Sequence, residues 1–294
     1  MNSKGEFVTL KKSPNVSDDF YGAVVNLGAL GIVTWIKLEV VPAFQVRQFV
    51  YTWLPLASLS SHFDGIFSAA YSVSLFTDWS NSEAVNQVRL KYKVDTKDAN
   101  FIPSKEFYGA ELSEFQRHPV EGISPENCTD AVGVPGPSYE RLPHFKLGFT
   151  PSVGEELQSE FFVPRMLALQ ALSAVSNLGP KITPCLVISE IRSIAQDNFW
   201  MSPCYRGPAI GIHFTWKADW SNVQHAIPLV EEALYPFGAV PHFGKLFSMK
   251  RDQFSSQFPK FTEFQQLMKK FDPEGKFSNY FIHRNITGQP HARL

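Results

Sequence analysis

Two stretches, CLVISEIRS at 185–193 and IGIHFTW at 210–216, decide the predicted fold. Both alternate as half-buried β-strands do, because successive side chains of a strand point to opposite faces. In the first, one face carries an apolar row that ends in an acid and a base: Leu186, Ile188, Glu190 and Arg192. In the second, the face opposite the apolar residues carries Gly211, His213 and Thr215. If the two strands pair, one sheet face gathers four polar side chains: Glu190, Arg192, His213 and Thr215.

Such a face suits a polyhydroxylated ligand. Carboxylate, guanidinium, imidazole and hydroxyl groups each donate to or accept from hydroxyls, and Arg192 can bridge two oxygens. The residues also allow plainer interpretations, with Glu190 and Arg192 as a surface ion pair of little energetic value and His213 as a structural histidine. The segment PHFGK at 241–245 is equally open, since Lys245 also fits an ordinary solvated lysine.

The rest of the chain predicts an α+β fold with an antiparallel sheet and flanking helices. Apolar periodicity and turn residues give strands and helices without regular βαβ alternation, which argues against a Rossmann domain. The predicted strands are 32–41, 44–53, 72–77, 87–94, 184–193 and 209–216. The predicted helices are 56–70, 161–178, 222–237 and 261–271. The proline-rich stretch 95–143 is predicted to be a long loop, which in a compact domain is commonly functional.

Composition restricts the function classes. The 27 Lys+Arg against 28 Asp+Glu do not favour nucleic acid as a partner, and 44% hydrophobic residues predict a packed core. Three widely spaced cysteines predict neither a disulfide framework nor a metal site. The first twelve residues contain no apolar signal region, and no run reaches the roughly 18 apolar residues of a membrane span. A cytoplasmic location is therefore expected, with membrane-surface association left open.

Six segments, in one order along the chain, resemble the alditol oxidase and D-arabinono-1,4-lactone oxidase family of FAD-linked oxidases. They are GALGIVT (28–34), YSVSLFTDW (71–79), SEIR (189–192), HFTW (213–216), HFGKLF (242–247) and FDPEGKFSNY (271–280). This family has the fold of the vanillyl-alcohol-oxidase-like flavoproteins, in which an FAD-binding domain is split around a substrate-binding cap. The resemblance implies that 1–44 ends the first FAD-domain segment, 45–244 is the cap, and 245–294 returns to the FAD domain.

The resemblance also implies roles for individual residues. The positions that meet the polyol are matched by Glu190, Arg192, Thr215 and Lys245, with His213 beside them. Catalytic roles fall on Lys245, Arg192, Glu190 and His213: the two cations would stabilise developing negative charge, Glu190 would hold a neighbouring hydroxyl, and His213 would orient Glu190 or assist proton transfer. Contacts to FAD are implied for Gly28, Gly31, Ile32 and His242.

The implied activity is FAD-dependent oxidation of an alditol, such as xylitol or sorbitol, by O2 with release of H2O2. SEIR and HFTW favour the alditol branch, and an aldonolactone oxidase of the D-arabinono-1,4-lactone or L-gulonolactone type is the alternative. Family members begin with a glycine-rich phosphate-binding loop and a histidine that bonds covalently to FAD, and neither occurs in this sequence. We therefore expect a fragment or an incomplete gene model that binds FAD weakly or not at all alone. A further alternative is a catalytically inactive, flavin-free polyol-binding module.

Overall fold

The computed structural model describes residues 1–15, 17–94, 102–149, 156–205 and 207–288. Ten strands of this described part form one antiparallel sheet in the order β10-β7-β9-β8-β2-β3-β1-β5-β4, with β6 paired to β1. The strands are β1 (Gln45–Pro55), β2 (Ser72–Thr77), β3 (Ala84–Val94), β4 (Glu106–Phe107), β5 (Ala110–Leu112), β6 (Gly136–Pro137), β7 (Leu157–Pro164), β8 (Leu186–Ile194), β9 (Ala209–Trp216) and β10 (Val240–Pro241). The predicted α+β class with an antiparallel sheet is confirmed.

The helices of this part are α1 (Asp19–Ala23), α2 (Leu56–Phe67), α3 (Ser138–Arg141), α4 (Ala168–Ser176), α5 (Gly179–Ile182), α6 (Trp220–Leu234), α7 (Arg251–Ser255), α8 (Phe261–Phe271) and α9 (Tyr280–Ile282). Helices α2, α4, α5 and α6 cover one face of this sheet, α1, α7, α8 and α9 gather near the chain ends, and α3 lies in the long loop beside β1 and β6. The predicted helix 222–237 is confirmed as α6 and a following 3₁₀ turn. Asp219 caps its first turn by accepting from the Asn222 backbone, and Gly238 ends it in the left-handed region at φ 70°.

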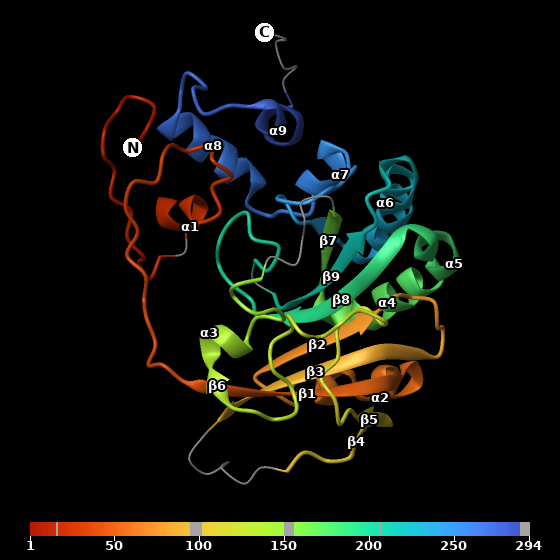
Figure 1. Ribbon diagram of the computed structural model, residues 1–294. Helices are drawn as coiled ribbons and strands as arrows, with labels where there is room; N and C mark the ends of the chain where they lie inside the picture. Colours follow the sequence, from red (N-terminus) through yellow and green to blue (C-terminus); the bar gives the residue numbers. More distant parts are fainter. Residues whose placement is uncertain (16, 95–101, 150–155, 206, 289–294) are drawn as a thin grey trace.

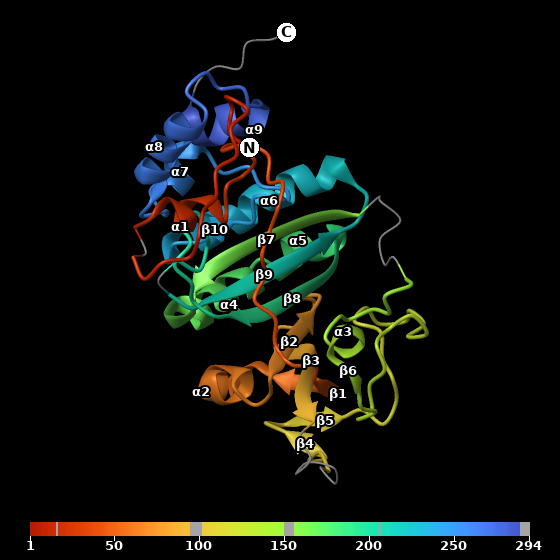
Figure 2. The same cartoon turned by 90° about the vertical axis from the view of Figure 1, so that its left-hand side faces the viewer.

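The main hydrophobic core lies between the apolar face of the sheet and helices α2, α4 and α6. Strand β9 alternates as the sequence predicts, and its core face is fully buried: Ile210, Ile212, Phe214 and Trp216. The apolar sides of the three helices complete this core, with Phe63, Leu172 and Val230 among their buried residues. Figure 2 shows α4, α5 and α6 behind strands β7 to β9, with α2 beside β1 to β3. The opposite face of the sheet carries polar side chains.

A second core joins the two ends of the chain. Tyr21 of α1 is buried with Phe254 of α7 and Phe264 of α8. The Ser3 backbone N–H donates to the Phe271 carbonyl at 3.2 Å. In Figure 1 the red N-terminal segment lies beside the blue helices α8 and α9.

Residues 32–41 do not form the strand that the sequence predicts. Their β-rich composition is real, but a strand needs a partner for its backbone groups. None of the backbone groups of 33–43 is hydrogen-bonded to another described residue, and the segment runs extended along the surface. Seven large apolar side chains are exposed there: Ile32, Val33, Trp35, Ile36, Leu38, Val40 and Val41.

Two further predictions need correction. The predicted helix 161–178 begins as strand β7, and α4 starts only at Ala168, because Val163 precedes Pro164 and a residue before proline is pushed towards extended backbone. Leu186 does not share a face with Glu190, because a β-bulge between Leu186 and Ile188 shifts the register and turns Leu186 into the core. Within the described part of the chain, no helix combines the length and apolar character needed to cross a membrane.

Candidate active site

Three neighbouring strands place their polar residues in one cross-strand row. The register pairs His213 of β9 with Glu160 of β7 on one side and with Glu190 of β8 on the other. In the next row, Gly211 lies between Phe162 and Arg192. A Cβ on Gly211 would come within 2.9 Å of a Glu160 carboxylate oxygen, so the missing side chain gives Arg192 room to reach across β9 to Glu160.

Glu160 is the centre of the cluster. Its side chain is 2% exposed and accepts hydrogen bonds from Arg192 Nη2 at 2.5 Å and from Lys245 Nζ at 2.7 Å. Burial alone would raise the pKa of Glu160. The nearby His213 ring, the charge of Arg192 and the hydrogen bond and charge of Lys245 outweigh it and hold that pKa far below its usual value. Glu160 is therefore an anion that fixes two cations side by side.

His213 extends this network along its own strand. Its Nδ1 lies 2.8 Å from Lys245 Nζ, and its Nε2 lies 3.0 Å from the Thr215 hydroxyl. An ammonium group can only donate, so Nδ1 accepts and the Nε2–H donates to Thr215. The predicted residues Glu190, Arg192, His213, Thr215 and Lys245 are thus brought together, and Lys245 is no isolated surface lysine.

Glu190 has a partner that the sequence did not indicate. His144 Nε2 lies 2.9 Å from Glu190 Oε1, whereas Arg192 Nε is 3.9 Å from the same oxygen. Burial lowers the pKa of His144 to about 4, so the neutral ring donates through Nε2. Burial would raise the pKa of Glu190, but the hydrogen bond from His144 and the charge of Arg192 lower it to about 2. The expectation that His213 orients Glu190 is wrong, because His213 bonds to Lys245 and Thr215 instead.

His144 lies at the end of the long loop. Two buried cations of β3 hold this loop against the sheet. Lys91 Nζ donates to the carbonyls of Leu142 and Pro143, and its pKa is lowered to about 7 by burial and by the charge of Arg89. Arg89 donates to the Arg117 carbonyl at 2.7 Å. The stretch 102–143 is a loop as predicted, apart from short elements, while 95–101 lies outside the described residues.

The residues expected to face FAD divide into two groups. His242 adjoins the cluster: its backbone N–H donates to the Glu160 carbonyl at 2.9 Å, and its Nδ1 accepts from Gly244. Gly28, Gly31 and Ile32 lie in the N-terminal segment, where Ile32 and Met1 exchange backbone hydrogen bonds and a Cβ on Gly31 would meet the Met1 carbonyl oxygen at 2.2 Å. In the described structure, no hydrogen bond or ion pair joins these three residues to the cluster.

Two members of the network, Glu160 and His144, were missed by reasoning from the sequence. Glu160 is the one acid in the strand LQSEFFVP at 157–164, and the alternation there would have placed it opposite Phe161 had the segment been taken as a strand. His144 follows a proline-rich loop and carries no periodic signal. Among the described residues, no group of three or more His, Cys, Asp and Glu is arranged to hold a metal ion.

Comparison with known proteins finds relatives that carry the names of sugar-alcohol and sugar-lactone oxidoreductases. Residues 156–285 match the family model of D-arabinono-1,4-lactone oxidase. Alditol oxidase of Streptomyces sp. is 42% identical over 92% of this chain and 63% of its own length. L-gulono-1,4-lactone dehydrogenase of Mycobacterium tuberculosis is 23% identical over 95% of this chain and 65% of its own length. The chain therefore spans somewhat under two thirds of these relatives.

A solved structure supports the fold. Glucooligosaccharide oxidase of Acremonium strictum superposes with a TM-score of 0.51 and 13% sequence identity, over 87% of this chain and 57% of that one. At this identity the likeness concerns the fold alone. The family assignment rests on the six colinear segments, the matching family model and the 42% identical relative. The chain belongs to the alditol oxidase and D-arabinono-1,4-lactone oxidase family of FAD-linked oxidases.

Proposed function

We propose that this chain forms the substrate-binding wall of an FAD-dependent oxidase that oxidises an alditol, with O2 as electron acceptor. The observation that carries the proposal is the Glu160 bridge. A buried carboxylate holds Lys245 and Arg192 side by side, and Glu190 and Thr215 lie on the same sheet face. Neighbouring donors and acceptors of this kind match the successive hydroxyls of an open-chain polyol.

Access for a ligand is best at Arg192. Its side chain is 40% exposed, although its Nε is buried and has no hydrogen-bond partner in the described part of the chain. A buried donor without a partner costs free energy, so an oxygen of a bound ligand would satisfy it. Glu190, anionic at neutral pH, can accept from a substrate hydroxyl while His144 holds its other side.

The residues of this wall fit a flavin ring placed against it. FAD, when bound, supplies the acceptor for the hydride that leaves the alcohol carbon. Lys245 and Arg192 would then stabilise negative charge that develops on the substrate oxygen and on the reduced ring. His242, tied to Glu160 through its backbone, is the residue of the predicted flavin side that adjoins this cluster.

The proposal also assigns separate roles to different segments of the chain. We assign 45–244 to the substrate-binding cap, and 1–44 with 245–294 to the flavin side. The second hydrophobic core favours this assignment, because it joins Tyr21 of the N-terminal segment to Phe254 and Phe264 of the C-terminal one. Residues 199–205 also reach into that core, as do Phe162, Ala209 and Val240 of strands β7, β9 and β10, so the two sides share this core along their boundary.

An aldonolactone oxidase is the second candidate, because the matching family model and the 23% identical relative both carry lactone names. The stronger likeness to alditol oxidase favours the alditol. Anaerobic stopped-flow reduction of FAD separates the two, measured on this chain joined to the FAD-binding segment of a family member. We expect xylitol and sorbitol to reduce the flavin faster than L-gulono-1,4-lactone. Reduction by the lactone alone would select the second candidate, and reduction by neither would refute both.

A further inference from the structure

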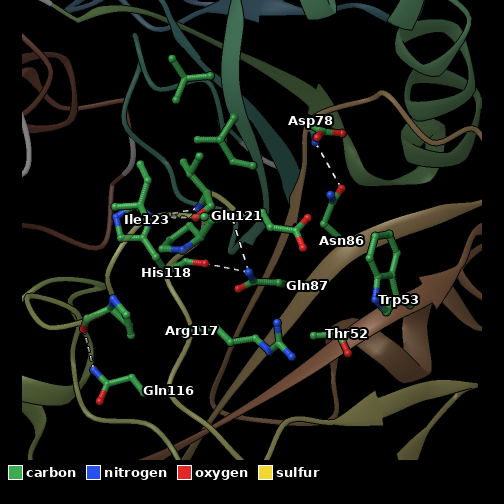
Figure 3. A pocket seen from close by; sticks show the side chains of 16 residues that line it. Thr52, Trp53, Asp78, Asn86, Gln87, Gln116, Arg117, His118, Glu121 and Ile123 are labelled. Atoms are coloured by element: carbon green, nitrogen blue, oxygen red, sulfur yellow. Dashed lines mark hydrogen bonds between the residues drawn. The ribbon is translucent and has the colours of Figure 1, made fainter.

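A cavity lies at the end of the sheet where the long loop crosses β1, β2 and β3. Its volume is about 210 Å³, and its labelled walls include Thr52, Trp53, Asp78, Gln87 and Arg117 (Figure 3). The cavity shares no residue with the Glu160 cluster. Strand β8 contributes Val187 and Ile188 to the wall, and Glu190 follows two residues later, so the cavity is a neighbour of the proposed substrate site and not part of it.

Trp53 has an unusual backbone conformation. It lies inside strand β1 but has φ 61°, in the left-handed region that a bulky residue rarely adopts. Its neighbour Leu54 is fully buried, whereas the Trp53 side chain is 48% exposed at the cavity. Strained residues of this kind concentrate at ligand sites. A half-exposed indole offers a flat apolar surface whose negative π-face attracts polarised C–H groups.

The polar wall combines donors with acceptors. Arg117 uses Nε to bind the Ser113 hydroxyl, and in the described structure its terminal nitrogens have no partner. Asn86 accepts from the Asp78 backbone and keeps its amide N–H groups available, while Glu121 makes no hydrogen bond to another described residue. In Figure 3, Arg117, Asn86 and Glu121 surround the same space as Trp53 and Gln87.

The charges of the wall select against ions. Asp78 and Glu121 oppose an anion, and Arg117 opposes a cation. His118 adds no charge at neutral pH, because burial lowers its pKa. The Asp78 carboxylate already accepts from Ser80. With anions and cations disfavoured, the wall suits a neutral ligand that is rich in hydroxyl groups. The ligand must also be small, because the volume of the cavity is below the roughly 300–1,000 Å³ of drug-sized ligand pockets.

We propose that this cavity binds a single sugar ring or a short polyol, with the Trp53 indole stacked on the apolar side of the ligand. Arg117, Asn86 and Glu121 would bind its hydroxyls. This second carbohydrate site acts without the flavin and without the Glu160 cluster. Its failure would therefore leave the proposed oxidase function untouched, since that function is read from flavin reduction.

The test follows the Trp53 indole N–H by NMR while D-glucose or xylitol is added to the purified chain. The peak is assigned as the one missing in Trp53→Ala. We expect it to shift saturably, with a Kd on the order of 1 mM, in wild type, in Glu190→Gln and in Trp220→Ala. Trp220 is a matched control, because it is 52% exposed on α6 and lies outside the cavity. In Arg117→Met, whose side chain is at the surface, binding should weaken at least tenfold.

Three outcomes would overturn the proposal. The Trp53 peak does not move with either ligand, or it moves equally in Arg117→Met. The third is loss of the shift in Glu190→Gln, which would place the ligand at the Glu190 site. Arg117→Met also guards against a folding artefact, because it leaves the strained Trp53 backbone and the Arg117 carbonyl that binds Arg89 unchanged.

Discussion

The polar face of the sheet carries two pairs of cations with different surroundings. Arg192 and Lys245 share the Glu160 carboxylate and remain partly exposed, at 40% and 18% of their side chains. Arg89 and Lys91 of β3 are about 1% exposed and donate to loop carbonyls. An arginine and a lysine therefore serve the candidate site in one pair and anchor the long loop in the other. A carboxylate partner keeps a cation charged and near solvent, whereas neutral carbonyl partners suit a cation that anchors a loop.

The pKa values follow this difference. Burial lowers the pKa of Lys91 to about 7 and that of Arg89 to about 10, since no carboxylate in the described part of the chain forms an ion pair with either. Two nearby carboxylates, by contrast, raise the pKa of Arg192 against the effect of its burial. Partner chemistry, more than the residue type, separates the pair suited to ligand charge from the pair that holds the fold.

Lys245→Met should give the largest effect. It removes one of the two cations that Glu160 presents, and losing one such group from a site that stabilises developing charge costs on the order of 10²–10³ in rate. The measurement is anaerobic flavin reduction by xylitol in this chain joined to the FAD-binding segment of a family member. Lys217→Met is the matched control, because Lys217 donates to the Pro184 carbonyl at the surface and should keep the wild-type rate. Wild-type reduction in Lys245→Met would make the lysine structural only.

Acidification tests the link between the loop and the site. The pKa of His144 is about 4 in the folded chain and 6.5 in the unfolded one. Between these values the unfolded chain binds a proton that the folded chain does not. The unfolding free energy therefore falls as pH drops from 6.5 to 4, by up to roughly 3 kcal/mol. Below pH 4.5 the lowered pKa of Glu190 adds a further loss, which continues towards pH 2.

His144→Asn separates the two contributions. In urea titrations at several pH values, the variant should lose the pH dependence between 6.5 and 4. The part below 4.5 should remain but shrink, because Arg192 still lowers the pKa of Glu190 after the hydrogen bond from the His144 ring is lost. An unchanged slope in the variant would show that other groups titrate there, and that His144 is not the buried neutral donor to Glu190.

Lys91→Met should have the smallest effect on global stability. The variant removes a donor from the Leu142 and Pro143 carbonyls, but it also removes a buried charge, and the two effects oppose one another. We expect the unfolding free energy to change by less than about 2 kcal/mol, with faster proteolysis of the loop around 140–149. A loss of more than about 3 kcal/mol would instead mean that Lys91 belongs to a true buried ion pair.

The alternation of polar and apolar residues was enough to predict a strand and its two faces where the strand has a neighbouring strand on each side. Strands β8 and β9 were predicted with their faces, apart from the bulge near Leu186, and Glu190, Arg192, His213 and Thr215 meet there. The apolar pattern from Phe161 predicts a helix, and this prediction leaves Glu160 outside any strand. Pro164 favours extended backbone before it, and the structure has strand β7 there. His144 could not be found at all, because only the sheet positions the loop that carries it.

The exposed segment 32–41 has a consequence for handling the protein. Its side chains are 52–86% exposed at the seven large apolar positions, and the backbone groups of 33–41 make no hydrogen bond to another described residue. Lys37 and Glu39 are its only charges and they cancel, so the stretch has no net charge to repel another copy. It combines the traits of an aggregation-prone window: β-rich, apolar, uncharged overall and without proline. We therefore expect samples to associate through this segment, and to do so faster as the protein concentration rises.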